Sequence, residues 1–189
     1  MQIDINRLSR EYAEKNILVI GDIILDAYIY GKVDRISQEA PVPIVAIDRK
    51  KFKPGGAANV ALNLSGLGAN VQLLGVTGDD SNAEELQNCF QESENIQLHL
   101  VKDKSRPTIV KTRIIADGKQ VFRLDEEITS EISSLLIEEL IKVFNESCKD
   151  IDGIIIEDYN KGALPKEIIS HIINHSSKHE IPVYVDPKY

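Results

Sequence analysis

The chain has 189 residues, a formal net charge of −8 and a pI near 5.1, an acidic balance that argues against a general nucleic-acid binder. No apolar run approaches the length of a membrane span, and the polar N-terminus lacks the pattern of a signal peptide. Cys89 and Cys148 are isolated, so neither a disulfide framework nor a zinc site is indicated. We expect a soluble, cytoplasmic protein.

Short apolar runs alternate with segments of helical periodicity along the chain. The patterns predict strands at 17–20 (ending at Gly21-Asp22), 71–76, 96–101, 151–156 and 183–185. They predict helices at 56–67, from a cap at 77–80 to about 90, at 131–146 and at 165–178. In the helix at 131–146, the apolar positions include Leu135, Leu140 and Phe144. Such alternation indicates βαβ units, and hence an α/β fold with three α-β-α layers and a mainly parallel sheet.

Two segments depart from this alternation. Residues 28–48 contain an extended stretch, 40–47, whose prolines favour an edge strand. Residues 107–125 contain a predicted hairpin around Asp117-Gly118, a strong two-residue turn signal. β-Structure inserted beside a glycine-opened helix is typical of a lid over a ligand site, and ordinary edge decoration is the alternative.

An unbroken hairpin register fixes which side chains share a face. It places Lys111, Arg113 and Gln120 on one face, and Thr112 and Arg123 on the other.

Residues 54–61 place two glycines, Gly55 and Gly56, directly before a predicted helix. A glycine pair there leaves bare N–H groups that a polar ligand approaches without striking a Cβ. The amide of Asn59, one turn into the helix, suits a hydroxyl-rich molecule. A tight strand-to-helix turn, packed for steric reasons, explains the same spacing.

Polar residues follow several predicted strands, where ligands of open parallel sheets bind. They are Asp22, Asp26, Asp79, Asp80, Asp158, Lys161, Asp186 and Lys188. Aspartates at strand ends are also common helix caps, so their convergence is the stronger signal.

Three charged patterns have functional and structural interpretations. Residues 102–113 are locally basic, which suits an anionic small molecule or a solvated face. The acidic stretch 125–150 is most simply the exposed side of a helix. His171, His175 and His179 lie along one side of a helix, and a solvated flank is favoured over a metal site. The chain has no P-loop, and no dinucleotide fingerprint follows its first strand.

The sequence resembles the ribokinase-like (PfkB) carbohydrate kinases from about Ile17 onward, over nearly all of the chain. The resemblance rests on residues 21–26 (GDIILD), residues 55–61 (GGAANVA) and the lid-like insertions. Within that family, the chain resembles the heptose 7-phosphate kinase branch more closely. That kinase is often the N-terminal half of a bifunctional ADP-heptose synthase, which serves lipopolysaccharide core assembly. That likeness is carried by residues 35–43 (RISQEAPVP), 107–113, 123–125, 158–162 and 186–188, although Gln38 stands where a proline is expected.

The resemblance implies a role for each matching position. Sugar hydroxyls would be held by Asp26, Gly55, Gly56 and Asn59. The lid would contribute Lys111, Arg113, Gln120 and Arg123, of which the basic residues meet the sugar phosphate. Asp158 and Lys161 would face the reacting centre, and the phosphate and ATP side would carry Lys161, Asp186 and Lys188.

The implied reaction transfers the γ-phosphoryl group of ATP, with Mg²⁺, to the anomeric hydroxyl of D-glycero-D-manno-heptose 7-phosphate. Members of the family commonly form homodimers through the β lid. Their N-x-x-E magnesium motif and the G-x-G-D motif that carries the catalytic base follow the position of Lys188, and the chain ends at Tyr189. We therefore expect residues 1–189 to be the N-terminal portion of a kinase domain, with no catalytic base or metal ligand of its own.

Three other functions remain open. Another PfkB kinase, acting on fructose phosphate, ribose or a nucleoside, shares most of these motifs. A non-catalytic module that binds sugar or dimerises through the lid is the second, and a dinucleotide-dependent enzyme is a distant third.

The 189-residue chain alone is expected to show no ATP-dependent phosphorylation of a sugar phosphate, because the nucleotide-side motifs follow Lys188 in the family. A coupled assay of ADP release measures this. Clear turnover would contradict the interpretation as an N-terminal portion.

Overall fold

The structure is a computed structural model that describes residues 10–188. The predicted strands and helices are confirmed, with shifted ends. The elements are β1 (Asn16–Ile36), β2 (Pro43–Gly56), α2 (Ala57–Gly66), β3 (Asn70–Gly78), α3 (Ser81–Asn88), β4 (Ile96–Asp103), β5 (Ile109–Ala116), β6 (Lys119–Glu126), α4 (Ser134–Ser147), β7 (Gly153–Asp158), α5 (Lys166–His179) and β8 (Val183–Pro187). No helix in this described range is long and apolar enough to cross a bilayer.

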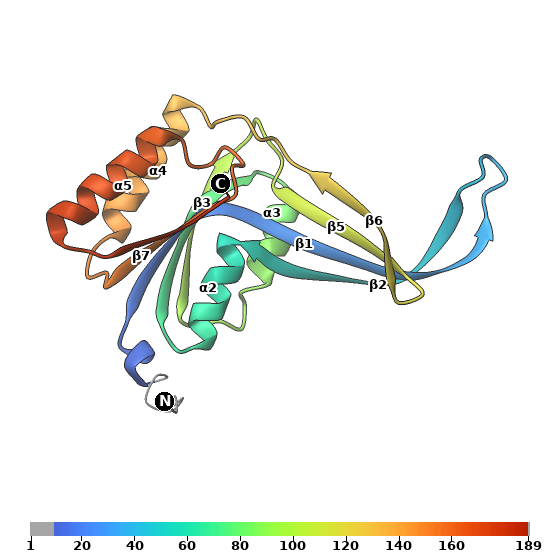
Figure 1. Cartoon of the computed structure of the whole chain (residues 1–189), viewed down its shortest axis with the longest axis horizontal. Helices are drawn as coiled ribbons and strands as arrows, with labels where there is room; N and C mark the ends of the chain where they lie inside the picture. Colours follow the sequence, from blue (N-terminus) through green and yellow to red (C-terminus); the bar gives the residue numbers. More distant parts are fainter. Residues whose placement is uncertain (1–9, 189) are drawn as a thin grey trace.

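A parallel sheet forms the centre of the molecule, with strand order β4-β3-β1-β7-β8. Helices α2 and α3 cover one face, and α4 and α5 cover the other (Figure 1). Successive residues of β1 supply both cores: Leu18 and Ile20 pack under α4 and α5, and Val19 packs on the opposite side. This two-sided burial explains the continuous apolar run and confirms the three-layer α/β prediction.

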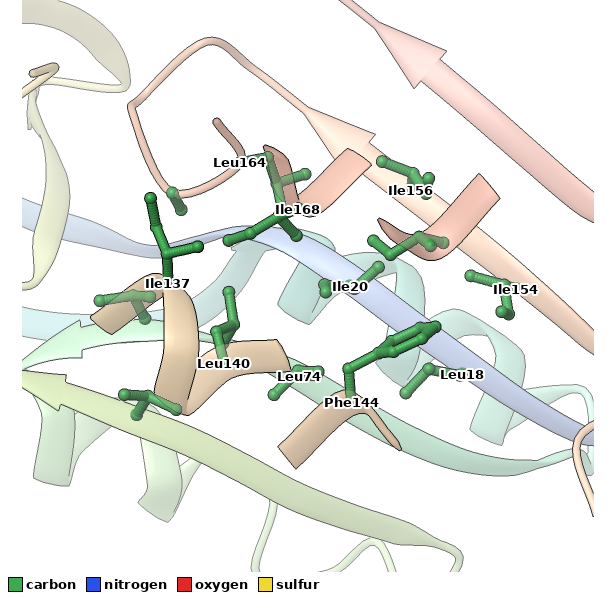
Figure 2. Packing of buried hydrophobic residues seen from close by; sticks show 14 of the residues in the cluster. Leu18, Ile20, Leu74, Ile137, Leu140, Phe144, Ile154, Ile156, Leu164 and Ile168 are labelled. Atoms are coloured by element: carbon green, nitrogen blue, oxygen red, sulfur yellow. The ribbon is translucent and has the colours of Figure 1, made fainter. Parts of the chain in front are cut away.

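The core beneath α4 and α5 joins the two helices to the sheet (Figure 2). Phe144 and Leu140 of α4 pack with Ile168 of α5 against the strand residues Ile154 and Ile156. The sequence pattern placed Leu135 on the same face, but its side chain is 75% exposed. Ser133 caps α4, so Leu135 falls in the first turn, on the side away from the sheet.

The first strand is longer than predicted, and this extension creates the lid. It does not end at Gly21-Asp22 but continues to Ile36, since apolar residues of high strand propensity follow. Residues 16–22 pair with β3 and β7, whereas residues 23–36 pair with β2, and residues 24–31 with β5. Gly21 lies where the partners change, and a Cβ there would strike the carbonyl oxygen of Glu157 in β7.

The lid is a second sheet with the order β2-β1-β5-β6, which extends away from the helices (Figure 1). Its first segment, residues 23–56, is longer than the expected 28–48, and its second, residues 109–126, nearly matches the expected 107–125. Among the described residues, β2 pairs with β1 alone, which confirms the edge strand that the prolines predicted. The strand begins later than predicted, since residues 40–42 precede it.

Replacing Leu140 by Ala is expected to lower the free energy of unfolding by about 2–5 kcal/mol, because the fully buried side chain leaves a cavity. The same change at exposed Leu135, in the same helix, should cost no more than about 0.5 kcal/mol. Urea unfolding measures the free energy of unfolding of both variants. Equal decreases in this free energy would contradict the placement of α4.

Candidate functional site

A hollow of about 400 Å³ lies where the lid meets the carboxyl ends of the parallel strands. Its lining residues are Ile24, Asp26, Gly56, Lys111, Arg113, Arg123, Tyr159, Lys161 and Lys188. Two other hollows are larger, one by Tyr12 and Tyr184 at the amino ends of the strands and one by Tyr30 and Arg49 in the lid. Neither gathers as many charged side chains, so the hollow at the lid junction, called here the junction pocket, is the candidate site.

The floor of the junction pocket is built from β1 and Gly56, whereas Gly55 is buried beside them and is not a lining residue. Asp26 accepts a hydrogen bond from Arg113 Nη1 at 2.6 Å through its Oδ1. A Cβ on Gly55 would lie 2.8 Å from the Oδ2 of Asp26. Gly56 has φ = 55°, and a Cβ there would strike the backbone oxygen of Asp22. The steric interpretation of the glycines is therefore correct, and the same packing brings bare backbone to the pocket.

Helix α2 begins beside this floor without a side-chain cap. Gly56 is its N-cap and makes no side-chain hydrogen bond, and the first turn contains no acidic residue. The first N–H groups of α2 and their partial positive charge thus lie next to the pocket. Asn59 lies exposed in that first turn, outside the lining residues.

Five cationic side chains from four parts of the chain converge on the pocket. Lys111 and Arg113 come from β5, Arg123 from β6, Lys161 from the loop after β7, and Lys188 from the end of β8. The predicted separation of Arg123 from Lys111 and Arg113 is wrong. A bulge between Ile114 and Ile115 shifts the register by one residue, so Arg123 pairs with Arg113 and shares its face.

Besides Asp26, two further carboxylates partner these cations. Arg123 holds Asp125 with two hydrogen bonds of 2.7 Å, and these bonds, with Lys111, lower the pKa of Asp125 to about 2. Glu127 contacts Lys161 at 2.6 Å and Lys111 at 3.3 Å. Burial opposes its ionisation, but the two lysines outweigh burial and lower its pKa. Sequence reasoning missed Glu127, since it assigned the acidic stretch to an exposed helix face.

Asp22 fixes the loop that carries Lys161. Its side chain is fully buried, and Oδ2 accepts the backbone N–H groups of Tyr159 at 2.8 Å and Lys161 at 3.1 Å. Burial raises the pKa of Asp22, against the opposing effect of these N–H donors. The sequence signals for Asp22 were its position after the first predicted strand and its place in the string at residues 21–26.

Other predicted site residues lie outside the pocket lining. Gln120 is exposed next to the hairpin turn and pairs with Ile115. Asp158 accepts the N–H of Asn160 in its own loop at 2.9 Å. Asp186 lies on β8, in register with Glu157.

The basic run at 102–106 serves the structure rather than an anion site. Arg106 is buried against Asp103 at 2.8 Å, and Lys102 pairs with Asp79. Asp80 caps α3 and also accepts the backbone N–H of Thr108.

Two histidines of α5, His171 and His175, are half-buried against α4, so the expected solvated flank is correct only for the exposed His179. His171 and His175 contact the edge of Phe144, and His171 shares a hydrogen bond with Asn145. Across residues 10–188, no group of three or more His, Cys, Asp or Glu side chains is arranged to hold a metal ion.

The sequence model of the pfkB family of carbohydrate kinases matches residues 14–189. The chain belongs to this family.

Curated relatives within the pfkB family extend far beyond this chain. The bifunctional protein HldE of a Nitratiruptor species is 44% identical over 172 residues, which cover 91% of this chain and 36% of that protein. The HldE of a Helicobacter pylori strain is 43% identical over 175 residues, or 92% of this chain and 38% of that protein. The chain thus spans little more than a third of the length of these relatives.

Solved structures share the fold at low identity. A possible 1-phosphofructokinase of Thermotoga maritima superposes with a TM-score of 0.69 at 17% identity, over 90% of this chain and 53% of that one. Ribokinase of Arabidopsis thaliana, solved with ribose and ATP, gives a TM-score of 0.62 at 14% identity, over 91% and 53%. These similarities confirm the ribokinase-like fold.

Glu157 is another buried carboxylate at the carboxyl end of the sheet. It lies on β7, two residues before Tyr159, and its Oε2 has no hydrogen-bond partner among residues 10–188. Burial, with the neighbouring charge of Asp186, raises its pKa to about 7. The native state therefore binds a proton that the unfolded chain releases at lower pH.

This shift predicts that stability falls as the pH rises from about 4.5 to 7 and stays low above that range. Replacing Glu157 by Gln should remove the loss and raise the free energy of unfolding at pH 8 by an amount on the order of 1–3 kcal/mol. At pH 4.5 the variant and the parent should be nearly equal. Denaturant unfolding of the parent and of Glu157→Gln across this pH range tests the prediction, with the change of exposed Glu138 to Gln as the control. Parallel profiles of unfolding free energy against pH for the parent and Glu157→Gln would contradict it.

Proposed function

We propose that this chain provides the sugar-phosphate-binding part of an ATP-dependent heptose kinase. One observation carries the proposal: five cations and the Asp26 carboxylate converge on one pocket at the uncapped N-terminus of α2. Such a pocket offers acceptors and N–H donors for hydroxyls at its floor and positive charge for a phosphate beside them.

The sugar would lie over the glycine floor. Asp26 has one oxygen engaged by Arg113, and Oδ2 is left to accept a hydrogen bond from a sugar hydroxyl. Gly55 and Gly56 admit the sugar close to the backbone, and Asn59 would reach a further hydroxyl from the first turn of α2.

The phosphate would lie among the cations of the lid. Counting Asp26, Asp125 and Glu127 against the five cations leaves a net charge of +2 around the pocket. A phosphate monoester carries about −1.5 to −2 at pH 7, so the site compensates one such group. Gln120 would complete the lid, while Asp158, Asp186 and Lys188 would lie toward the nucleotide.

We assign D-glycero-D-manno-heptose 7-phosphate as the substrate, since the HldE relatives are 44% and 43% identical over nine-tenths of the chain. The anomeric oxygen would attack the γ-phosphorus of ATP, the bond to the bridging oxygen would break, and ADP would leave. We propose that the metal, the ATP site and the base belong to a longer protein of the HldE type, since the chain spans only 36% and 38% of those relatives. Because ATP is the donor, we place the reaction in the cytoplasm.

A homodimer through the lid completes the proposal. Ile47 on β2 and Phe122 and Leu124 on β6 are more than half exposed, in a sheet that extends away from the helices (Figure 1). Such apolar side chains on a projecting sheet suit contact with a second copy. Sedimentation at several concentrations measures the association.

Isothermal titration calorimetry with heptose 7-phosphate and the unphosphorylated heptose tests the binding proposal. Arg123→Gln should weaken binding of the phosphorylated sugar about tenfold and leave the other unchanged, since a charge-assisted hydrogen bond is lost. Asp26→Asn should weaken both sugars about equally. Lys119→Gln, on β6 but outside the pocket lining, is the matched control.

Absence of binding by the parent protein, or unchanged affinities in both variants, would contradict the proposal. Tighter binding of fructose 6-phosphate than of heptose 7-phosphate would contradict the assignment of heptose 7-phosphate as the substrate and favour another sugar phosphate.

A further inference from the structure

Glu127 joins the lid to the parallel sheet through two ion pairs. It follows β6 in the connection to α4, and each of its oxygens contacts a different lysine. Oε1 lies 2.6 Å from Lys161 Nζ, in the loop after β7, and Oε2 lies 3.3 Å from Lys111 Nζ, on lid strand β5. One carboxylate therefore spans the boundary between the two sheets.

This carboxylate contacts the lysines from outside the junction pocket. Lys111 and Lys161 are lining residues, whereas Glu127 is not. The side chains of Lys111, Lys161 and Glu127 are only 13%, 12% and 20% exposed. An ammonium group has three N–H donors. Lys161 directs one to Glu127, and Lys111 directs two to Glu127 and Asp125, so both retain a donor for a ligand.

The chain segment that carries Glu127 is fastened to the loop that carries Lys161. Ile132 donates its backbone N–H to the carbonyl of Gly162 at 3.0 Å. Gly162 has φ = 82°, and any side chain there would strike the carbonyl of Ser130. With Asp22 holding the backbone of Lys161, the loop is fixed from both sides and Glu127 sets the end of the lysine side chain.

We propose that Glu127 is a positioning residue for phosphate recognition, holding Lys111 and Lys161 at the spacing at which both meet one phosphate group. The inference rests on the proposed function, since it assumes that the junction pocket binds the phosphate of the sugar. Without the carboxylate, the two ammonium groups repel each other, Lys161 loses its ion pair with Glu127, and Lys111 keeps only its pair with Asp125. Glu127 thus lowers the repulsion and the side-chain entropy that binding would otherwise cost.

The opposite role, in which Glu127 competes with the phosphate for the lysines, predicts the opposite result. A competitor that is neutralised lets the anion bind more tightly. A positioning residue that is neutralised makes it bind more weakly.

The test is calorimetric titration of the full-length protein with heptose 7-phosphate and with the unphosphorylated heptose. Glu127→Gln is expected to raise the Kd of the phosphorylated sugar about tenfold, as if one lysine no longer contributed its charge-assisted hydrogen bond to the phosphate, and to leave the other Kd unchanged. Glu126→Gln, the same change at the exposed neighbouring residue, is the matched control and should leave both values unchanged.

A double-mutant cycle separates positioning from a general structural effect. In a Lys161→Met background, Glu127→Gln should cause a smaller further loss than in the parent, because only Lys111 of the two lysines that it positions remains. Glu127→Asp keeps the charge but is one methylene too short to reach both lysines, so it should resemble Glu127→Gln. It also carries the test if Glu127→Gln fails to fold, which thermal unfolding reports.

Equal or tighter binding of heptose 7-phosphate by Glu127→Gln overturns the inference, as does a full additional loss in the Lys161→Met background. Failure of the parent protein to distinguish the two sugars overturns the proposed function. A parent that distinguishes them, with an unchanged Glu127→Gln variant, overturns only the role of Glu127.

Discussion

Strand β1 belongs to two sheets at once, and every part of the candidate site takes its position from it. Its first third is the middle strand of the parallel sheet, and the rest is an inner strand of the lid. At the transition, Gly21 lets β7 approach closely, Asp22 receives two N–H groups of the loop after β7, and Asp26 faces the lid arginine Arg113. A rigid strand thus relates the floor of the pocket to its roof.

The charges of the site are compensated within the protein. Lysine and arginine side chains are costly to bury without partners, and here Asp26, Asp125 and Glu127 supply them. These ion pairs occupy only some of the N–H donors of the lysines and arginines. Ammonium and guanidinium groups carry more N–H donors than the three carboxylates accept, so further donors face the pocket. The pocket can therefore be stable without a ligand and still recognise an anion.

The carboxylates of this region differ in pKa because they differ in partners rather than in burial alone. Asp125, held by Arg123 and Lys111, has a pKa near 2. Glu157 is buried beside Asp186 without a cation, and its pKa rises to about 7. Asp22 is the most deeply buried, but the N–H groups that it accepts offset part of the cost of its charge. Two buried carboxylates on the adjacent strands β1 and β7 thus behave differently: Asp22 is a structural acceptor, and Glu157 titrates near neutral pH.

The sequence by itself determined the fold class, nearly all of the elements, the glycine floor and the lid, because these follow from local periodicity and turn chemistry. It also identified Asp26, Lys111, Arg113, Arg123, Lys161 and Lys188, all of which line the pocket. Only the tertiary structure decided which charges face one another. The bulge that turns Arg123 toward Arg113 depends on the register of two strands. The ion pair between Arg106 and Asp103 depends on the burial of both side chains. Glu127 and Leu135 show the same limit, since a one-dimensional pattern records the type of a side chain but not the surface that the folded chain brings against it.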